Sequence, residues 1–183
     1  MARMYPLQAQ VYPQTANWLR QARDTIPRRD GGQIWRAFLR YGQFTPHEAT
    51  RVLTWGEGPF VRIVRLKKLG LFVPQAPTAV MISRSLARAY ERAPRVRRNQ
   101  LALEAIVLHE LVHWGDWRDG IEQPDVRRGR TRLDVGDQFE VAAYGFNVGQ
   151  ASSFGMYILR QQQAQERARD RQFDDTFGSP LDI

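Results

Sequence analysis

Residues 99–114 constrain the fold more than any other stretch of the chain, because they are apolar on nearly every side of a helix. No proline or glycine interrupts them. A helix without a polar face has to be covered by neighbouring elements on most sides. We therefore expect a central, buried helix with Asn99 as its N-cap and Gly115 at its end. Its apolar side chains are Leu101, Leu103, Ile106, Val107, Leu108, Leu111 and Val112.

The same stretch carries two of the three histidines of the chain, His109 and His113, with Glu110 beside the first. Residues four apart share one face of a helix, so both imidazoles can reach one Zn²⁺ while the glutamate addresses a water molecule. Burying these groups without a partner would cost desolvation free energy. The H-E-x-x-H pattern therefore predicts two zinc ligands and a catalytic Glu110. The alternative is a pair of hydrogen-bonded core histidines.

A third zinc ligand has to be a carboxylate, because the chain has no cysteine and His47 lies in the first turn of a different predicted helix. Glu140, on the next helix after the histidines, is the leading candidate, and the small residues after it permit close helix approach. Asp119, six residues after His113, is the alternative. A site without a third ligand also stays open, as do the carboxylates of Asp116, Asp134 and Asp137.

Other features can assist turnover. Tyr144, one turn after Glu140, is a candidate for stabilising the oxyanion of the transition state, with a role in core packing as its alternative. The strand predicted over 78–83 can pair with the substrate backbone as an edge strand. The polar stretch 119–136 is long enough to cover the site as a lid.

Patterns elsewhere predict an α+β fold that is mostly helical and has a small sheet. Apolar spacing predicts helices over 13–26 and after Gly32, and Thr45 to Glu48 has the form of a capping box. Alternating or β-branched runs predict strands over 60–66, 71–73 and 78–83. The remaining predicted helices run from a Ser83 cap to Arg92, from an Asp137 cap to about Asn147, and from Ser152 or Ser153 to about Arg171.

Two segments resemble a known group of enzymes. H-E-L-V-H-W-G-D (residues 109–116) followed by G-D-Q-F-E-V-A-A-Y-G (residues 136–145) is similar to the zinc metallopeptidase domains of bacterial polymorphic toxins and type VI secretion effectors. The resemblance implies a minimal zincin-like fold of the gluzincin type, with Glu110 as catalytic acid and base. It implies zinc ligation by His109, His113 and Glu140. It also implies a peptide or protein substrate, and does not separate proteins from cell-wall peptide.

The resemblance also sets expectations for organisation and partners. We expect one metallopeptidase domain over 1–183, with a helical N-terminal part (1–59), a zincin-like core (60–150) and a loose tail (174–183). A cognate immunity protein and a secretion-apparatus partner are expected. The N-terminus has no apolar run typical of a signal peptide, and no stretch is apolar enough to span a membrane. We expect secretion without a cleaved signal peptide and delivery into a target cell, with a cytoplasmic location as the alternative.

The net charge of +8 supports a rival interpretation. A basic surface attracts nucleic acid, anionic membranes or acidic proteins. The chain shows no helix-turn-helix, RNA-recognition or zinc-finger pattern, so nucleic acid is not the expected partner. A basic nucleic-acid- or protein-binding module with a structural metal, or none, is nevertheless the main alternative to a peptidase.

Overall fold

A computed structural model describes residues 3–121, 123–129 and 131–148, which lie in one compact unit. The helix predicted from Ser152 or Ser153 and the loose tail lie outside the described residues. None of the described helices is both long and apolar enough to cross a membrane.

Helices precede the first strand. The capping box is confirmed, since the Glu48 N–H donates to the Thr45 hydroxyl and the Thr45 N–H donates to the Glu48 carboxylate. Positive φ angles at Asp30, Gly31 and Gly32 reverse the chain direction between two of the helices. The elements are α1 (Pro6–Val11), α2 (Pro13–Thr25), the 3₁₀ segment η1 (Ile26–Gly32), α3 (Gln33–Tyr41) and α4 (Pro46–Leu53).

The sheet has three strands, β1 (Phe60–Val64), β2 (Gly70–Phe72) and β3 (Ala79–Ser83), in the order β1-β3-β2. β3 pairs in parallel with β1 and antiparallel with β2. Both of its sides are therefore occupied, so the prediction that residues 78–83 form the edge strand for substrate is wrong. The uncharged, buried sequence of β3 is typical of a central strand. The strand at the edge beside the histidine helix is β2.

Helix α5 (Arg84–Arg92) begins as predicted, with the Leu86 N–H donating to the Ser83 hydroxyl. Helix α6 (Arg97–Arg118) is longer than predicted at both ends. Asn99 is not its cap. The Asn99 side-chain amide donates instead to the carbonyls of Ala89 and Ala93, and so ties α6 to the end of α5.

Gly115 lies inside α6 and does not end it. A Cβ at this position would collide with the carbonyl oxygen of Gly42 and with the ring of Phe44. This glycine therefore serves close packing, which the sequence alone could not distinguish from a helix stop.

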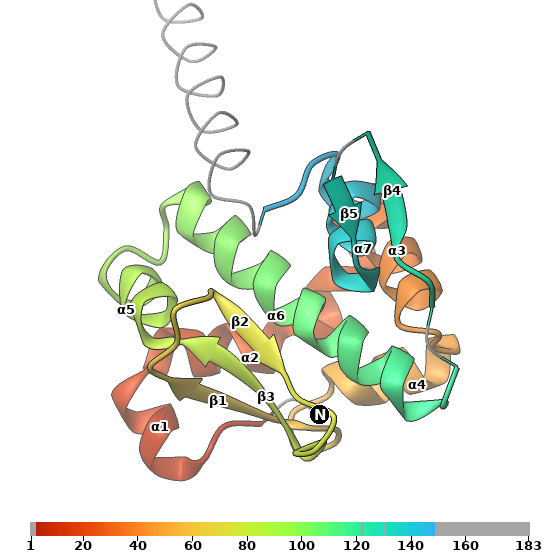
Figure 1. The fold of residues 1–183 in the computed structure, drawn as a ribbon. Coiled ribbons are helices and arrows are strands. Elements are labelled where there is room, and N and C mark those ends of the chain that lie inside the picture. Colours follow the sequence, from red (N-terminus) through yellow and green to blue (C-terminus); the bar gives the residue numbers. More distant parts are fainter. Residues whose placement is uncertain (1–2, 122, 130, 149–183) are drawn as a thin grey trace, which may run out of the picture. The chain divides into compact units, whose positions relative to one another are not determined.

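The polar stretch after α6 is partly ordered as a hairpin of β4 (Val126–Arg128) and β5 (Thr131–Leu133), followed by α7 (Val135–Tyr144). The cap of α7 is Asp134, which accepts from the Asp137 N–H, so the predicted cap at Asp137 is wrong. Figure 1 shows α6 running between the sheet and α7, and α7 also packs against α3. The architecture confirms a mostly helical α+β fold with a small sheet.

Candidate metal centre

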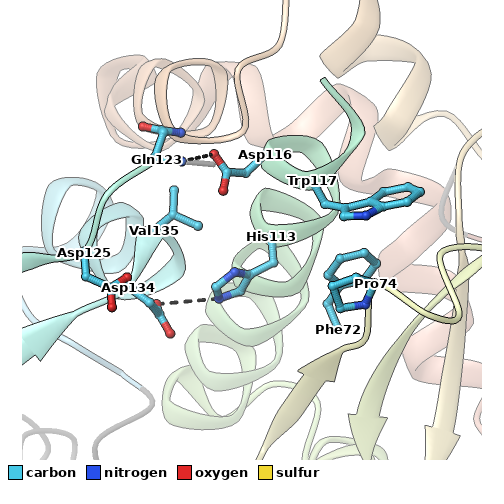
Figure 2. A pocket seen from close by; sticks show the side chains of 9 residues that line it. All are labelled: Phe72, Pro74, His113, Asp116, Trp117, Gln123, Asp125, Asp134 and Val135. Atoms are coloured by element: carbon cyan, nitrogen blue, oxygen red, sulfur yellow. Dashed lines mark hydrogen bonds and ion pairs between the residues drawn. The ribbon is translucent and has the colours of Figure 1, made fainter. Parts of the chain in front are cut away.

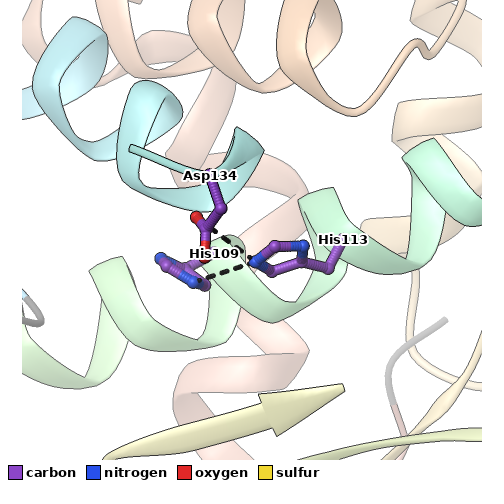
Figure 3. A group of neighbouring side chains, drawn as sticks. All are labelled: His109, His113 and Asp134. Atoms are coloured by element: carbon purple, nitrogen blue, oxygen red, sulfur yellow. Dashed lines mark hydrogen bonds and ion pairs between the residues drawn. The ribbon is translucent and has the colours of Figure 1, made fainter. Parts of the chain in front are cut away.

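The two histidines of α6 face one point, as their spacing predicts. Nε2 of His109 lies 3.2 Å from Nε2 of His113. Asp134, at the cap of α7, brings a carboxylate oxygen to within 3.5 Å of the His113 nitrogen. His109, His113 and Asp134 form a group of potential metal ligands, with one ligand atom each and all three atoms within 4.8 Å of one another (Figure 3). It is the one such group in the described part of the chain.

The spacing of these atoms fits a zinc ion. Ligand nitrogens about 2.0–2.1 Å from zinc in a tetrahedral arrangement lie about 3.3 Å apart. The nitrogens of His109 and His113 are 3.2 Å apart, and the Asp134 oxygen lies 3.5 Å from His113. Two imidazoles with one carboxylate are a ligand set that zinc accepts, with a fourth position left for water or substrate.

Glu140 lies at the other side of His109. It is fully buried, and one of its oxygens is 2.8 Å from Nδ1 of His109 while the other accepts from the Val148 N–H. A carboxylate in this position orients a metal-binding imidazole. Its hydrogen bond holds the proton on Nδ1 and so leaves the lone pair of Nε2 free for a metal ion. The predicted role of Glu140 as a ligand stays a prediction. The geometry favours Asp134 for the ligand and Glu140 for orientation.

Gly136 permits this arrangement, a role that the sequence did not predict. It lies in the first turn of α7, where a Cβ would collide with the imidazole of His109 around Nε2. Glycine thus lets the start of α7 approach the histidines closely enough for Asp134 to join them. No signal in the sequence indicated this role, because Gly136 precedes Asp137, the predicted cap. Only the structure places this glycine inside a helix, where it is unfavourable unless packing requires it.

Glu110 lies on the sheet side of α6 and is 5% exposed. A Cβ at Gly70 would collide with its carboxylate, so the edge strand β2 passes directly beside it, and it also has a hydrogen bond with the backbone of Phe72. Burial raises the pKa of Glu110, which the nearby charges of His109 and His113 partly oppose.

Electrostatics at the centre favour a cation. Burial lowers the pKa of His109, but the hydrogen bond to Glu140 and the charges of Glu110 and Asp134 outweigh burial and raise it to about 9. Burial acts to raise the pKa of Asp134, yet hydrogen bonds from His113 and the Asp137 N–H hold it well below its usual range. Asp134 is thus ionised, as a metal ligand must be.

The other predicted carboxylates lie outside this group. Asp119 accepts from the Ile121 N–H at the end of α6, and Asp137 accepts from the side-chain amide of Asn147. The Asp116 carboxylate accepts from Gln43 and from the backbone of Gln123. It therefore ties α6 to neighbouring loops.

Tyr144 does not join the group either. Its hydroxyl is 3.4 Å from Glu104, which forms an ion pair with Arg29. Sequence analysis did not identify this buried cluster, because Arg29 and Glu104 are 75 residues apart. The oxyanion role of Tyr144 stays a prediction.

In the described residues, the H-E-x-x-H helix thus meets an aspartate close to both histidines and a glutamate bonded to one of them. The sequence model of the metallopeptidase toxin 3 family matches residues 8–145. The chain belongs to this family. The match covers most of the chain. It includes the N-terminal helices, which lie outside the two segments (109–116 and 136–145) that carry the resemblance. No curated protein and no solved structure matches the chain.

Membership confirms the resemblance to metallopeptidase toxins that the sequence suggested. It decides between the two predicted classes, favouring a metallopeptidase over a basic nucleic-acid-binding module. It also implies a metal ion, for which His109, His113 and Asp134 are the group available among the described residues.

Proposed function

We propose that this metallopeptidase toxin is a zinc-dependent enzyme that hydrolyses peptide bonds. The observation that carries the proposal is the convergence of two imidazole Nε2 atoms, 3.2 Å apart, with the carboxylate of Asp134. Imidazole ligands favour zinc over magnesium or calcium, which prefer oxygen. In the proposed site His109, His113 and Asp134 hold the ion, and Glu140 orients His109.

Zinc bound there would polarise the scissile carbonyl and lower the pKa of a water molecule to about 7. Glu110 accepts the proton of the attacking water and then donates it to the leaving amine. Its buried position raises its pKa, which suits a group that has to accept and release a proton near neutral pH. Glu140 keeps the His109 ring in one tautomer throughout.

The edge strand β2 supplies a place for the substrate backbone. It pairs with β3 on one side, and its residue Gly70 lies directly beside Glu110 of α6. Unpaired backbone groups of an edge strand can pair with an extended peptide. An extended substrate along β2 would lie next to Glu110 and the histidines. The proposal therefore assigns to β2 the role that the sequence predicted for residues 78–83.

We further propose that the enzyme is a secreted antibacterial or host-directed effector that acts inside a target cell. The support is the family, whose members are described as metallopeptidase toxins. Delivery by a type VI secretion apparatus and neutralisation by an immunity protein are parts of this proposal. Growth arrest on expression of the wild type, absent with Glu110→Gln, would support it. Equal growth with both proteins, at equal expression, would contradict it.

Metal content by mass spectrometry tests the site. We expect about one zinc ion per chain in the wild type, and loss of that ion in His113→Ala and in Asp134→Ala. Glu140→Gln should still bind zinc. Retention by Asp134→Ala together with loss from Glu140→Gln would assign the third ligand to Glu140. A wild type that binds no zinc after reconstitution would contradict the proposal.

A further inference from the structure

A pocket of about 210 Å³ adjoins the proposed metal centre (Figure 2). His113 and Asp134 line it on one side, and α6 continues its wall with Asp116 and Trp117. Pockets for whole drug-sized ligands usually measure about 300–1,000 Å³. The smaller volume beside the histidines suits a single side chain of a bound peptide.

We propose that this pocket is a specificity subsite for a lysine or arginine side chain of the substrate, with Asp116 as its charge partner. The proposal rests on the proposed peptidase function. It adds a substrate class, which neither the family nor the metal centre specifies.

The charge of the pocket supports a cationic ligand. Of the nine described residues that line it, three are aspartates and none is a lysine or an arginine, although the chain carries a net charge of +8. Two of these aspartates already have cationic or metal-binding neighbours, since Asp125 pairs with Arg132 and Asp134 lies beside His113. Asp116 forms no ion pair with any described residue.

Asp116 is 7% exposed, and its hydrogen bonds leave one oxygen available. Gln43 Nε2, at 2.8 Å, and the Gln123 N–H, at 3.1 Å, both donate to Oδ1. Oδ2 has no hydrogen bond with a described residue, and Asp116 is one of the residues that line the pocket. A nearly buried carboxylate without a cation is costly, and a cationic ligand would offset that cost.

Aromatic walls suit the rest of a lysine or arginine side chain. The rings of Phe72 and Trp117 have centroids 5.9 Å apart and are tilted by 56°. Pro74 lies beside Phe72 on the same side of the pocket. Such faces pack against a methylene stem and attract a cation at its end. Apolar walls with one carboxylate match a long side chain with a charged tip.

The position of the pocket relates it to the reaction. His113 and Asp134 belong to both the pocket and the proposed metal group. Phe72, at the end of the edge strand β2, lies on its other side. A peptide paired with β2 would therefore place one side chain in the pocket while its backbone passes the histidines.

The test uses two end-blocked alanine peptides that differ at one central residue, lysine in one and norleucine in the other. Norleucine keeps the stem and lacks the amine. Their kcat/KM values are measured with zinc-loaded wild type and Asp116→Asn. Asparagine preserves the acceptor for Gln43 and Gln123 and removes the charge. A charge-assisted hydrogen bond is worth about tenfold or more in affinity. We expect the wild type to prefer lysine by at least that factor and Asp116→Asn to lose the preference.

The matched control is Asp24→Asn, an equal change at an exposed aspartate of α2, which should keep the lysine preference. A wild type that cleaves both peptides with equal kcat/KM would overturn the proposal. So would an equal loss for both peptides in Asp116→Asn, which would show a structural role.

A second measurement separates this proposal from the proposed function. Calorimetry with the zinc-loaded Glu110→Gln variant compares binding of the same two peptides without turnover. Tighter binding of the lysine peptide, lost on adding Asp116→Asn, supports the subsite even if the wild type cleaves neither peptide. Cleavage of both peptides at equal rates, with equal binding, would leave the peptidase intact and overturn the subsite.

Discussion

Helix α6 carries two clusters of buried polar side chains that are built in different ways. In the first, Glu104 is 1% exposed, and each of its oxygens has a donor, Arg29 at 2.5 Å and the Tyr144 hydroxyl at 3.4 Å. In the second, the nitrogens of His109 and His113 converge with the carboxylate of Asp134 beside a pocket.

The difference lies in how donors match acceptors. In the Glu104 cluster each carboxylate oxygen is matched by a donor from another described residue. The histidine cluster collects atoms that can each offer a lone pair to the same point, and one cation would satisfy them together. Burial of ionisable groups on a helix therefore does not by itself indicate function. The arrangement of their free lone pairs does.

The largest expected effect is at Glu110, which neighbours the second cluster on α6. Glu110→Gln removes the proposed proton acceptor while keeping the shape of the side chain. We expect kcat to fall by about 10²- to 10⁴-fold, because general acid–base catalysis contributes that much. Zinc content should stay as in the wild type. Unchanged peptide turnover in a continuous fluorescence assay would remove Glu110 from the mechanism.

Gly136→Ala tests the close approach of α7 to His109. The added Cβ would collide with the imidazole, so helix and ring must move apart. Misplacement by about 1 Å can cost about 100-fold in rate, and we expect a fall of that size in kcat/KM. Gly31→Ala is the matched control, since Gly31 has open space around it and lies in a turn with positive φ. Equal losses in both variants would indicate general destabilisation.

Glu104→Gln tests whether the first cluster is only structural. Burial raises the pKa of Glu104 from 4.5 to about 7, with Arg29 opposing it. A raised carboxyl pKa means that the folded state binds the proton more tightly, so the free energy of unfolding falls as pH rises from about 4.5 to about 7. We expect Glu104→Gln to remove a fall on the order of 3 kcal/mol, measured by denaturant titration at several pH values.

Two comparisons sharpen the Glu104 result. Glu57→Gln, at an exposed surface ion pair, should leave the pH profile nearly as it is in the wild type. Zinc content should be unchanged in Glu104→Gln. Loss of zinc from this variant would show that the two clusters of α6 are coupled, contrary to the distinction drawn between them.

Glu140→Gln should have a smaller effect than loss of a ligand. An amide can still accept from the His109 ring, but it carries no charge with which to orient it. Removing an orienting partner typically costs about 10- to 100-fold in metal affinity. We expect the zinc affinity of Glu140→Gln to fall by a factor in that range, measured by competition with a chelating dye. An affinity equal to that of the wild type would contradict the orienting role.

The smallest expected effect is that of Tyr144→Phe. It removes a long hydrogen bond to Glu104, so we expect a loss of about 1 kcal/mol or less in the free energy of unfolding and no change in peptide turnover. A turnover rate lowered by a factor of about 100 or more, with stability preserved, would instead support the predicted oxyanion role. The variant thus tests to which cluster Tyr144 belongs.

Local signals in the sequence predicted much of this fold. The caps at Thr45 and Ser83 are confirmed, because a cap depends on residues within one turn of each other. The three strands lie within one or two residues of their predicted positions. Errors occurred where packing decides. Asn99 and Gly115 have the residue types of helix ends, yet α6 runs past both because neighbouring elements use them for contacts.

The sequence by itself determined the pairing of His109 with His113 and the place of Glu110, because helical periodicity places residues four apart on one face. Only the tertiary structure decided which carboxylate meets the histidines and which strand lies at the edge of the sheet. Asp134 is the cap of α7 and Glu140 lies within this helix. The close approach at Gly136 brings Asp134 to Nε2 of His113 and Glu140 to Nδ1 of His109. Such choices depend on how distant segments dock, and no local pattern encodes the docking of α7 on α6.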